Sequence, residues 1–183
     1  MTIKEILIVA SRDIWKEKEV GSYLDSANPE GQLITETLLK IFNIVENELA
    51  LDYLPLIAED VVSTTTGQVD FSKLSKSAVR ILSVKDKDGK SVKYDLFTQY
   101  LVAQSGELTI RYTYTPAPKG LYGEAEYKLY ASCRMIAYGI VAQYYYVNGM
   151  FDEGEIWNKK YREAIAAVYR ANLAGVIASR RWE

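Results

Sequence analysis

The 183-residue sequence contains no histidine and a single cysteine, Cys133. Histidine is the commonest acid–base residue near neutral pH and a frequent metal ligand, so its absence removes most of the usual catalytic and metal sites. One cysteine cannot form an internal disulfide, and its helical surroundings favour a buried packing role over a catalytic thiol. The sequence therefore favours a protein that is not an enzyme and needs no cofactor.

Long hydrophobic runs are also missing. The aliphatic run Ile6–Ala10 is flanked by charged residues, is far too short to span a membrane, and lacks a signal-peptide profile. We therefore expect a soluble protein that is made in the cytoplasm and has no membrane partner. With 49% hydrophobic and 25% charged residues, the composition is typical of one globular domain covering residues 1–183.

The net charge of −2 conceals an asymmetry along the chain. Residues 1–60 hold 12 acidic and 5 basic residues, whereas residues 61–120 hold 5 acidic and 9 basic ones. Such a division favours attraction between neighbouring copies of the chain, although an acidic helical face in contact with solvent explains it equally simply.

Hydrophobic spacing predicts helices in residues 1–60. Ile3, Ile6 and the apolar residues that follow predict a helix over residues 2–16, followed by a loop containing Gly21 and Pro29. A second and more regular helix is predicted by residues that advance three or four positions at a time: Ile34, Leu38, Ile41, Val45 and Leu49. Pro55 should end this helix.

From residue 67 to residue 116 the hydrophobic period changes to two. Alternating stretches such as 92–96 and 108–114 are separated by turn sequences, including Asp86–Gly89 and Ser105–Gly106. Short connections of this kind join antiparallel neighbours, so we expect a small β meander inserted in the chain.

Residues 124–173 return to a helical period and predict a helical hairpin. A Tyr-rich helix over residues 124–148 should end at Gly149, and Asp152 and Glu155 should cap a second helix. We expect Trp157 and Tyr161 to be buried against the first helix of the pair. The predicted fold is therefore α+β and mainly helical, with N-terminal helices, a small antiparallel β-meander insertion, a C-terminal helical hairpin and an extended tail over residues 174–183.

Three patterns that contain potential ligands, acid–base groups or stacking aromatics have simpler interpretations. Asp86, Asp88 and Gly89 resemble part of a calcium loop, but the first and last ligand positions do not match, which favours a turn. The carboxylates of Glu46, Glu48 and Asp52 have no evident environment that would separate their pKa values, so we interpret them as solvated. The consecutive tyrosines 144–146 lie in a segment without Lys or Arg, which favours packing over nucleic-acid stacking.

The tail ends in Arg180, Arg181 and Trp182, residue types that are common in binding hot spots. Hydrophobic periodicity fades after Val168, so this tail has little of its own chain to pack against. We expect it to bind a partner, and a frayed end is the alternative.

The order of elements resembles the head-to-tail connector, or adaptor, proteins of tailed bacteriophages and prophages. The segments Glu48–Leu56, Ala137–Tyr145 and Trp157–Ala164 are similar to segments of such proteins, as is the terminal Arg180-Arg181-Trp182. The likeness extends over most of the chain but consists of packing patterns.

The resemblance implies a virion structural protein of the head–tail neck, made in the bacterial host cytoplasm. It implies a homo-oligomeric ring, generally of twelve subunits, which binds the portal protein on one side and a tail or stopper protein on the other. The genome crosses the central channel on packaging and ejection without sequence-specific DNA binding. The resemblance also assigns portal docking to the tail residues Arg180, Arg181 and Trp182.

Three alternatives remain at this point. The chain is a tail-completion or other virion structural protein without portal contact, a small non-enzymatic binding module, or an enzyme that uses Cys133. Mass measurements with and without a portal separate the structural readings.

Overall fold

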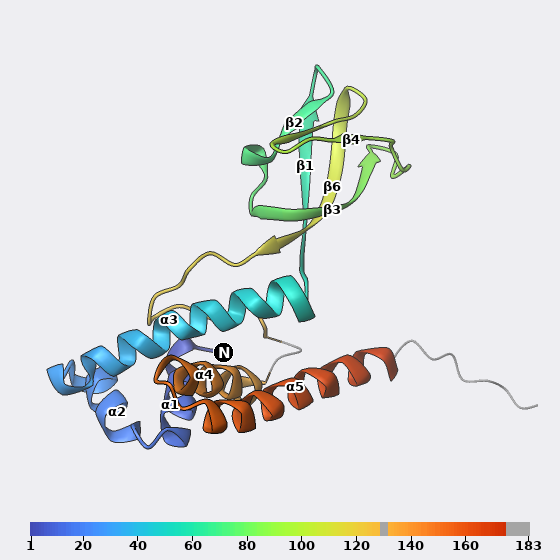
Figure 1. The fold of residues 1–183 in the computed structure, drawn as a ribbon. Coiled ribbons are helices and arrows are strands. Elements are labelled where there is room, and N and C mark those ends of the chain that lie inside the picture. The colour runs from blue at the N-terminus through green and yellow to red at the C-terminus, as the bar shows by residue number, and fades with distance from the viewer. Residues whose placement is uncertain (129–131, 175–183) are drawn as a thin grey trace, which may run out of the picture. The chain divides into compact units, whose positions relative to one another are not determined.

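The structure, a computed structural model, describes residues 1–128 and 132–174. Within these residues the fold is α+β, as predicted, with about 50% helix and two small antiparallel sheets. Contacts divide the chain into two compact units (Figure 1). The helical unit comprises Met1–Glu46 and the residues from Pro118 onward, and the β unit comprises Asn47–Ala117. The β unit thus begins about 20 residues before the predicted insertion at residue 67.

The first helix, α1 (Ile3–Asp13), begins at a capping box. The Thr2 side chain accepts a hydrogen bond from the backbone N–H of Glu5, and the Glu5 carboxylate accepts one from the N–H of Thr2. A turn follows in which Trp15 has a positive φ of 59°. A further helix, α2 (Glu17–Ser26), occupies the segment predicted as a loop. Its single buried residue is Val20, so hydrophobic spacing provides almost no sign of it.

The predicted regular helix is confirmed as α3 (Gln32–Glu48), preceded by the short 3₁₀ turn η1 (Pro29–Gly31). It buries Leu38, Ile41 and Val45, and continues into a π-helical turn, η2 (Leu49–Tyr53), before Pro55. The prediction that residues 1–60 are helical is wrong at its end, because strand β1 starts at Leu56. The residues after Pro55 alternate in exposure and pair with a partner strand, which decides in favour of a strand.

Two three-stranded antiparallel sheets form the β unit, in the orders β1-β6-β3 and β2-β5-β4. The strand bounds are β1 Leu56–Thr64, β2 Gln68–Asp70, β3 Ser77–Asp86, β4 Asp95–Leu96, β5 Tyr100–Val102 and β6 Gly106–Thr115. A short 3₁₀ turn, η3 (Phe71–Lys73), follows β2. The predicted meander is therefore wrong, because the last strand, β6, lies between the two early strands β1 and β3.

Both sheets contribute to one hydrophobic core in the β unit. Its buried residues are Val69, Leu74, Val84, Leu101, Leu108, Ile110, Tyr112 and Tyr114. The β6 residues in this core alternate with exposed or half-buried ones, as expected for a strand with one buried face. The same alternation leaves the opposite face of β1-β6-β3 in solvent.

The C-terminal hairpin consists of α4 (Cys133–Val147) and α5 (Phe151–Ala174), joined at Gly149, which has a positive φ of 74°. Two details differ from the prediction. Residues 124–128 are not helical, because Glu124 pairs with Thr2 and the N–H of Ala125 donates to the Met1 carbonyl. Asp152 lies in the first turn of α5 rather than at its cap.

None of the helices in the described part of the chain is long and apolar enough to cross a membrane.

Glycines allow close packing within this hairpin. A Cβ on Gly139 of α4 would lie 3.0 Å from the ring of Tyr161, and Gly154 of α5 lies against the ring of Tyr146. Tyr161 is buried, as predicted. Trp157 packs against α4 with its ring 5.6 Å from that of Tyr138, but it is only half-buried, so its predicted burial is met only in part. Trp157 lies at the edge of the α4–α5 contact and not in its centre.

Candidate interaction surfaces

No cluster of three potential metal ligands occurs among residues 1–128 and 132–174. Burial raises the pKa of the Cys133 thiol, which keeps it protonated and weakly nucleophilic at neutral pH. The Asp86–Gly89 segment is a tight turn, in which the Asp86 carboxylate accepts from the backbone N–H groups of Asp88 and Lys90. That carboxylate completes its own turn, as expected for an Asx-type turn.

Glu46 contradicts the prediction that it is solvated, because its side chain is 1% exposed. Its carboxylate accepts two hydrogen bonds from the Lys119 ammonium, at 2.8 and 3.0 Å, and one from the backbone N–H of Glu126 at 2.7 Å. One turn earlier on α3, the Asn43 amide exchanges two hydrogen bonds with the Lys119 backbone. We call Asn43, Glu46, Lys119 and Glu126 the α3 clamp. It fastens the segment after Pro118 to α3.

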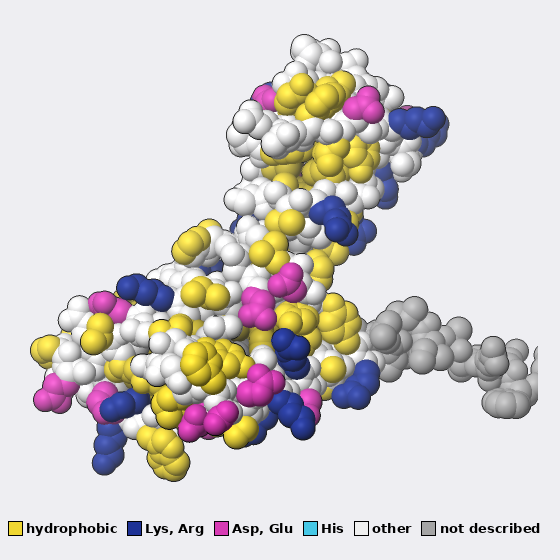
Figure 2. Space-filling model, viewed as in Figure 1, with side chains coloured by type: hydrophobic (Ala, Val, Ile, Leu, Met, Phe, Trp, Pro, Cys, Tyr) yellow, Lys and Arg dark blue, Asp and Glu magenta, His cyan; other side chains and the backbone are white. Residues whose placement is uncertain are grey.

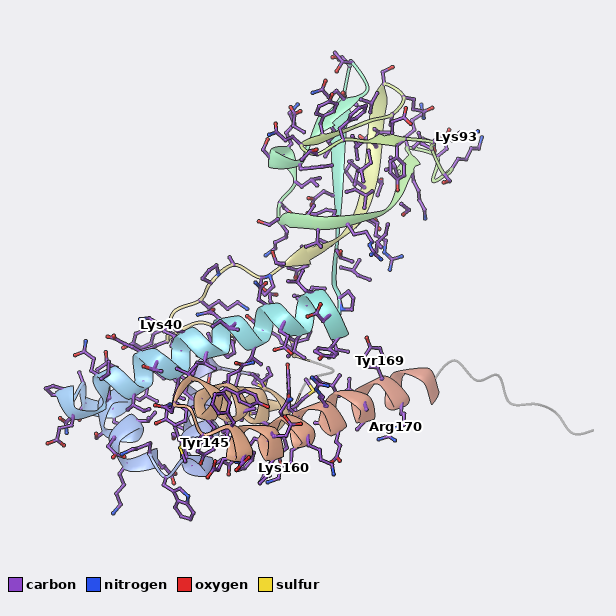
Figure 3. All side chains as sticks on the ribbon, viewed as in Figure 1. Lys40, Lys93, Tyr145, Lys160, Tyr169 and Arg170 are labelled. Carbon is purple, nitrogen blue, oxygen red and sulfur yellow. The ribbon has the colours of Figure 1, made fainter. Side chains whose placement is uncertain are left out.

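The predicted docking residues Arg180, Arg181 and Trp182 lie outside the described residues. The last described part of α5 ends at Ala174. Near that end Tyr169 and Arg170 are exposed on the helix (Figure 3). The tail's role therefore stays a prediction.

Exposed apolar residues occur at the C-terminal ends of α1 and α4 and in the turns that follow. Trp15 is 89% exposed and Phe151 is 68% exposed, and Val147 and Met150 are also exposed. The Tyr145 hydroxyl donates to the carbonyl of Asp13 at 3.4 Å, which joins the last turns of the two helices. We call Trp15, Val147, Met150 and Phe151 the Trp15 patch. Figure 2 shows hydrophobic side chains at the surface of the helical unit, and Figure 3 labels Tyr145.

The positive φ of Trp15 belongs to the C-terminal end of α1. The N–H groups of Trp15 and Lys16 donate to the carbonyls of Arg12 and Ser11, at 3.1 and 2.8 Å, so the left-handed residue ends the helix. In this position Trp15 presents most of its side chain to solvent, although burying it would be favourable. An exposed apolar surface of this kind is a candidate site for a protein–protein contact.

The outward face of the β1-β6-β3 sheet is a second exposed surface. It carries four exposed aliphatic residues, all on the two outer strands: Ile57, Val61, Val79 and Leu82. Hydrophobic side chains are visible on the β unit in Figure 2. The alternation of residues 108–114 predicted that the central strand β6 has one buried face, whereas β1 was not predicted as a strand, so the sequence did not indicate which strands lie at the edges.

Behind this face, Asp60 of β1 anchors the loop between β2 and β3. The Asp60 carboxylate accepts hydrogen bonds from the Tyr112 hydroxyl at 2.7 Å and from the backbone N–H of Ser75 at 2.7 Å. Burial alone would raise the pKa of Asp60, but these hydrogen bonds outweigh it and hold the pKa below its usual value. Burial and the neighbouring carboxylate raise the pKa of Tyr112.

Comparisons with protein families and with curated proteins identify no relative of this chain. No protein-family model matches the chain, and no curated protein matches it significantly.

Proposed function

We propose that the chain is a virion structural protein that forms a ring adaptor between the portal and the tail of a bacteriophage. The supporting observation is the Trp15 patch, which combines an almost fully exposed tryptophan at the end of α1 with the exposed apolar turn of the α4–α5 hairpin. Such a surface suits permanent burial in an assembly better than a free monomer. The resemblance of the element order and of the quoted segments to connector proteins supplies the identity of the assembly.

In this proposal the ring has a central channel through which the genome passes. The excess of acidic over basic residues in residues 1–60 is compatible with a channel that does not hold phosphate groups. The tail residues Arg180, Arg181 and Trp182 dock on the portal. Arginine side chains pair with carboxylates through two parallel hydrogen bonds, and the indole fills an apolar cleft.

The first test is co-sedimentation of the full chain with portal rings, together with mass measurement and electron microscopy of the complex. We expect a ring that forms on the portal. A chain that stays monomeric with the portal and does not sediment with it contradicts the proposal. Binding to tail components alone would instead support the alternative of a tail-completion protein.

Two variants assign the contacts. Trp15→Asn removes the indole while keeping a residue that tolerates positive φ, so the fold should be retained and ring formation should weaken. Leu33→Ser is the matched control, because Leu33 is another highly exposed apolar residue outside the Trp15 patch. Deleting residues 179–183 should spare the fold and weaken portal binding, and undiminished binding would show that the tail is not the anchor.

A further inference from the structure

The two outer strands of the β1-β6-β3 sheet carry different charges on its exposed face. The register places Glu59 of β1 opposite Arg111 of the central strand β6, and Arg111 opposite Ser83 of β3. On β3 the exposed charges are Arg80 and Lys85. The exposed charge on β1 is therefore acidic, and the exposed charges on β3 are basic.

Each side also carries two exposed aliphatic residues. Ile57 and Val61 flank Glu59 on β1, and Val79 and Leu82 flank Arg80 on β3. None of the ion pairs among the described residues involves Glu59, Arg80 or Lys85. Both sides thus present apolar side chains together with a charge that forms no ion pair with another described residue.

The two strands also differ in regularity. Strand β1 pairs with β6 without interruption over nine residues. Strand β3 has two irregularities, between Ala78 and Arg80 and between Ile81 and Ser83, so Val79 and Leu82 are the unpaired residues. Bulges prevent another strand from continuing the hydrogen-bonded ladder. Contact at the β3 side must therefore be made by side chains and not by strand addition.

We propose that the β1 side of one copy docks on the β3 side of a second copy. A second copy is the occupant because a single sheet carries both halves of the contact: Glu59 faces Arg80 and Lys85, and Ile57 and Val61 face Val79 and Leu82. Unlike surfaces in contact make a head-to-tail interface, which generates a ring when the rotation closes. This inference rests on the proposed ring adaptor and assigns the β units a place in its subunit contact.

Four aliphatic side chains and one charge cluster make a small interface. Contacts of this size are weak when isolated and become effective when neighbouring copies are already held together. The β-unit contact therefore acts together with other subunit contacts, and we expect free copies to exchange rapidly at low concentration.

Cross-linking tests the geometry directly in the full chain. The variant Val61→Cys/Leu82→Cys, on a Cys133→Ser background, is treated with a short bis-maleimide at high protein concentration and separated on a denaturing gel. A head-to-tail contact yields a ladder of trimers and larger species. Each single-cysteine variant should stay monomeric, because one cysteine then has no partner cysteine across the interface.

Charge reversal gives an independent readout of the same ladder. Glu59→Lys makes both sides basic, and Arg80→Glu/Lys85→Glu makes both sides acidic, so each variant alone should reduce the ladder roughly fivefold. An equal mixture of the two should restore it, since each side then meets an opposite charge on the other variant. Lys87→Glu, in the turn after β3, is the matched control and should have no effect.

The outcomes separate this inference from the proposed function. A ladder that stops at dimers, dimers from a single-cysteine variant, absence of any ladder, or a mixture that restores nothing would each overturn the head-to-tail contact. If portal rings still bind the chain in that case, the adaptor proposal stands without it. If the chain yields the cross-linked ladder but does not bind portal rings, the head-to-tail contact stands and the adaptor proposal fails.

Discussion

Replacing Glu46 by alanine should strongly destabilise the helical unit. The substitution leaves the ammonium of Lys119, whose side chain is 15% exposed, without its closest counter-charge. It also leaves the backbone N–H of Glu126 without its acceptor. Breaking a buried ion pair on one side typically costs 3–5 kcal/mol. The Glu126 carboxylate remains 3.6 Å from the ammonium and compensates in part, so we expect a loss of about 3 kcal/mol.

Tryptophan fluorescence during urea unfolding measures this loss of stability in the helical unit. The three tryptophans are at positions 15, 157 and 182, so none lies in the β unit. Half-buried Trp157 reports on the α4–α5 packing. With a slope of about 2 kcal/mol per molar urea, a loss of about 3 kcal/mol lowers the midpoint by about 1.5 M.

Two further variants make the interpretation specific. Glu163→Ala removes an exposed carboxylate from α5 and should change stability by less than about 0.5 kcal/mol. Glu46→Leu/Lys119→Leu removes both charges and should be less destabilised than Glu46→Ala, because no unpaired charge remains buried. A loss of stability below about 1 kcal/mol for Glu46→Ala would refute the argument, as would a double variant that is less stable than Glu46→Ala.

Two other predictions concern the packing and the pH dependence. Gly139→Ala should destabilise the helical unit by about 1–2 kcal/mol in thermal unfolding, because its new methyl group would lie 2.8 Å from the Val45 side chain and 3.0 Å from the buried ring of Tyr161. Gly21→Ala in α2 meets nothing within 4 Å and should stabilise slightly. Equal effects of the two substitutions would contradict the close packing at Gly139. Because the folded-state pKa of Asp60 is lowered, its contribution to β-unit stability is present above the unfolded pKa and is lost as the pH falls through the folded pKa. Acid unfolding, followed by near-UV circular dichroism of the tyrosines, should therefore depend less on pH for Asp60→Asn than for the unchanged protein. Tyr112→Phe removes the hydroxyl that donates to Asp60 and should lower the stability of the β unit by about 1–3 kcal/mol.

Elements with strong local signals could be predicted from the sequence. The spacing of Ile34, Leu38 and Ile41 defined α3, and Pro55 marked its end, because helix period and proline sterics act within a few residues. Helix α2 has too few apolar residues to produce a period. Its charged first turn therefore resembled a loop.

Features that depend on distant contacts could not be predicted. Glu46 looked solvated because its partner Lys119 is 73 residues away, so nothing near it in the chain indicated burial. Alternation identified strands in the β unit, but the place of β6 between β1 and β3 depends on topology. The Trp15 patch depends on a turn conformation and on the meeting of two chain segments, which no short motif encodes.

The α3 clamp has a consequence for the order of folding. Asn43 and Lys119 are 76 residues apart, so the clamp cannot form until the whole β unit has been synthesised. Closing a flexible loop of that length costs about 4 kcal/mol in chain entropy. The β unit is continuous in sequence, and its β1–β6 pairing sets Leu56 opposite Tyr114, near its two ends. A β unit that folds first therefore brings those ends together and removes most of the entropic barrier to completing the helical unit.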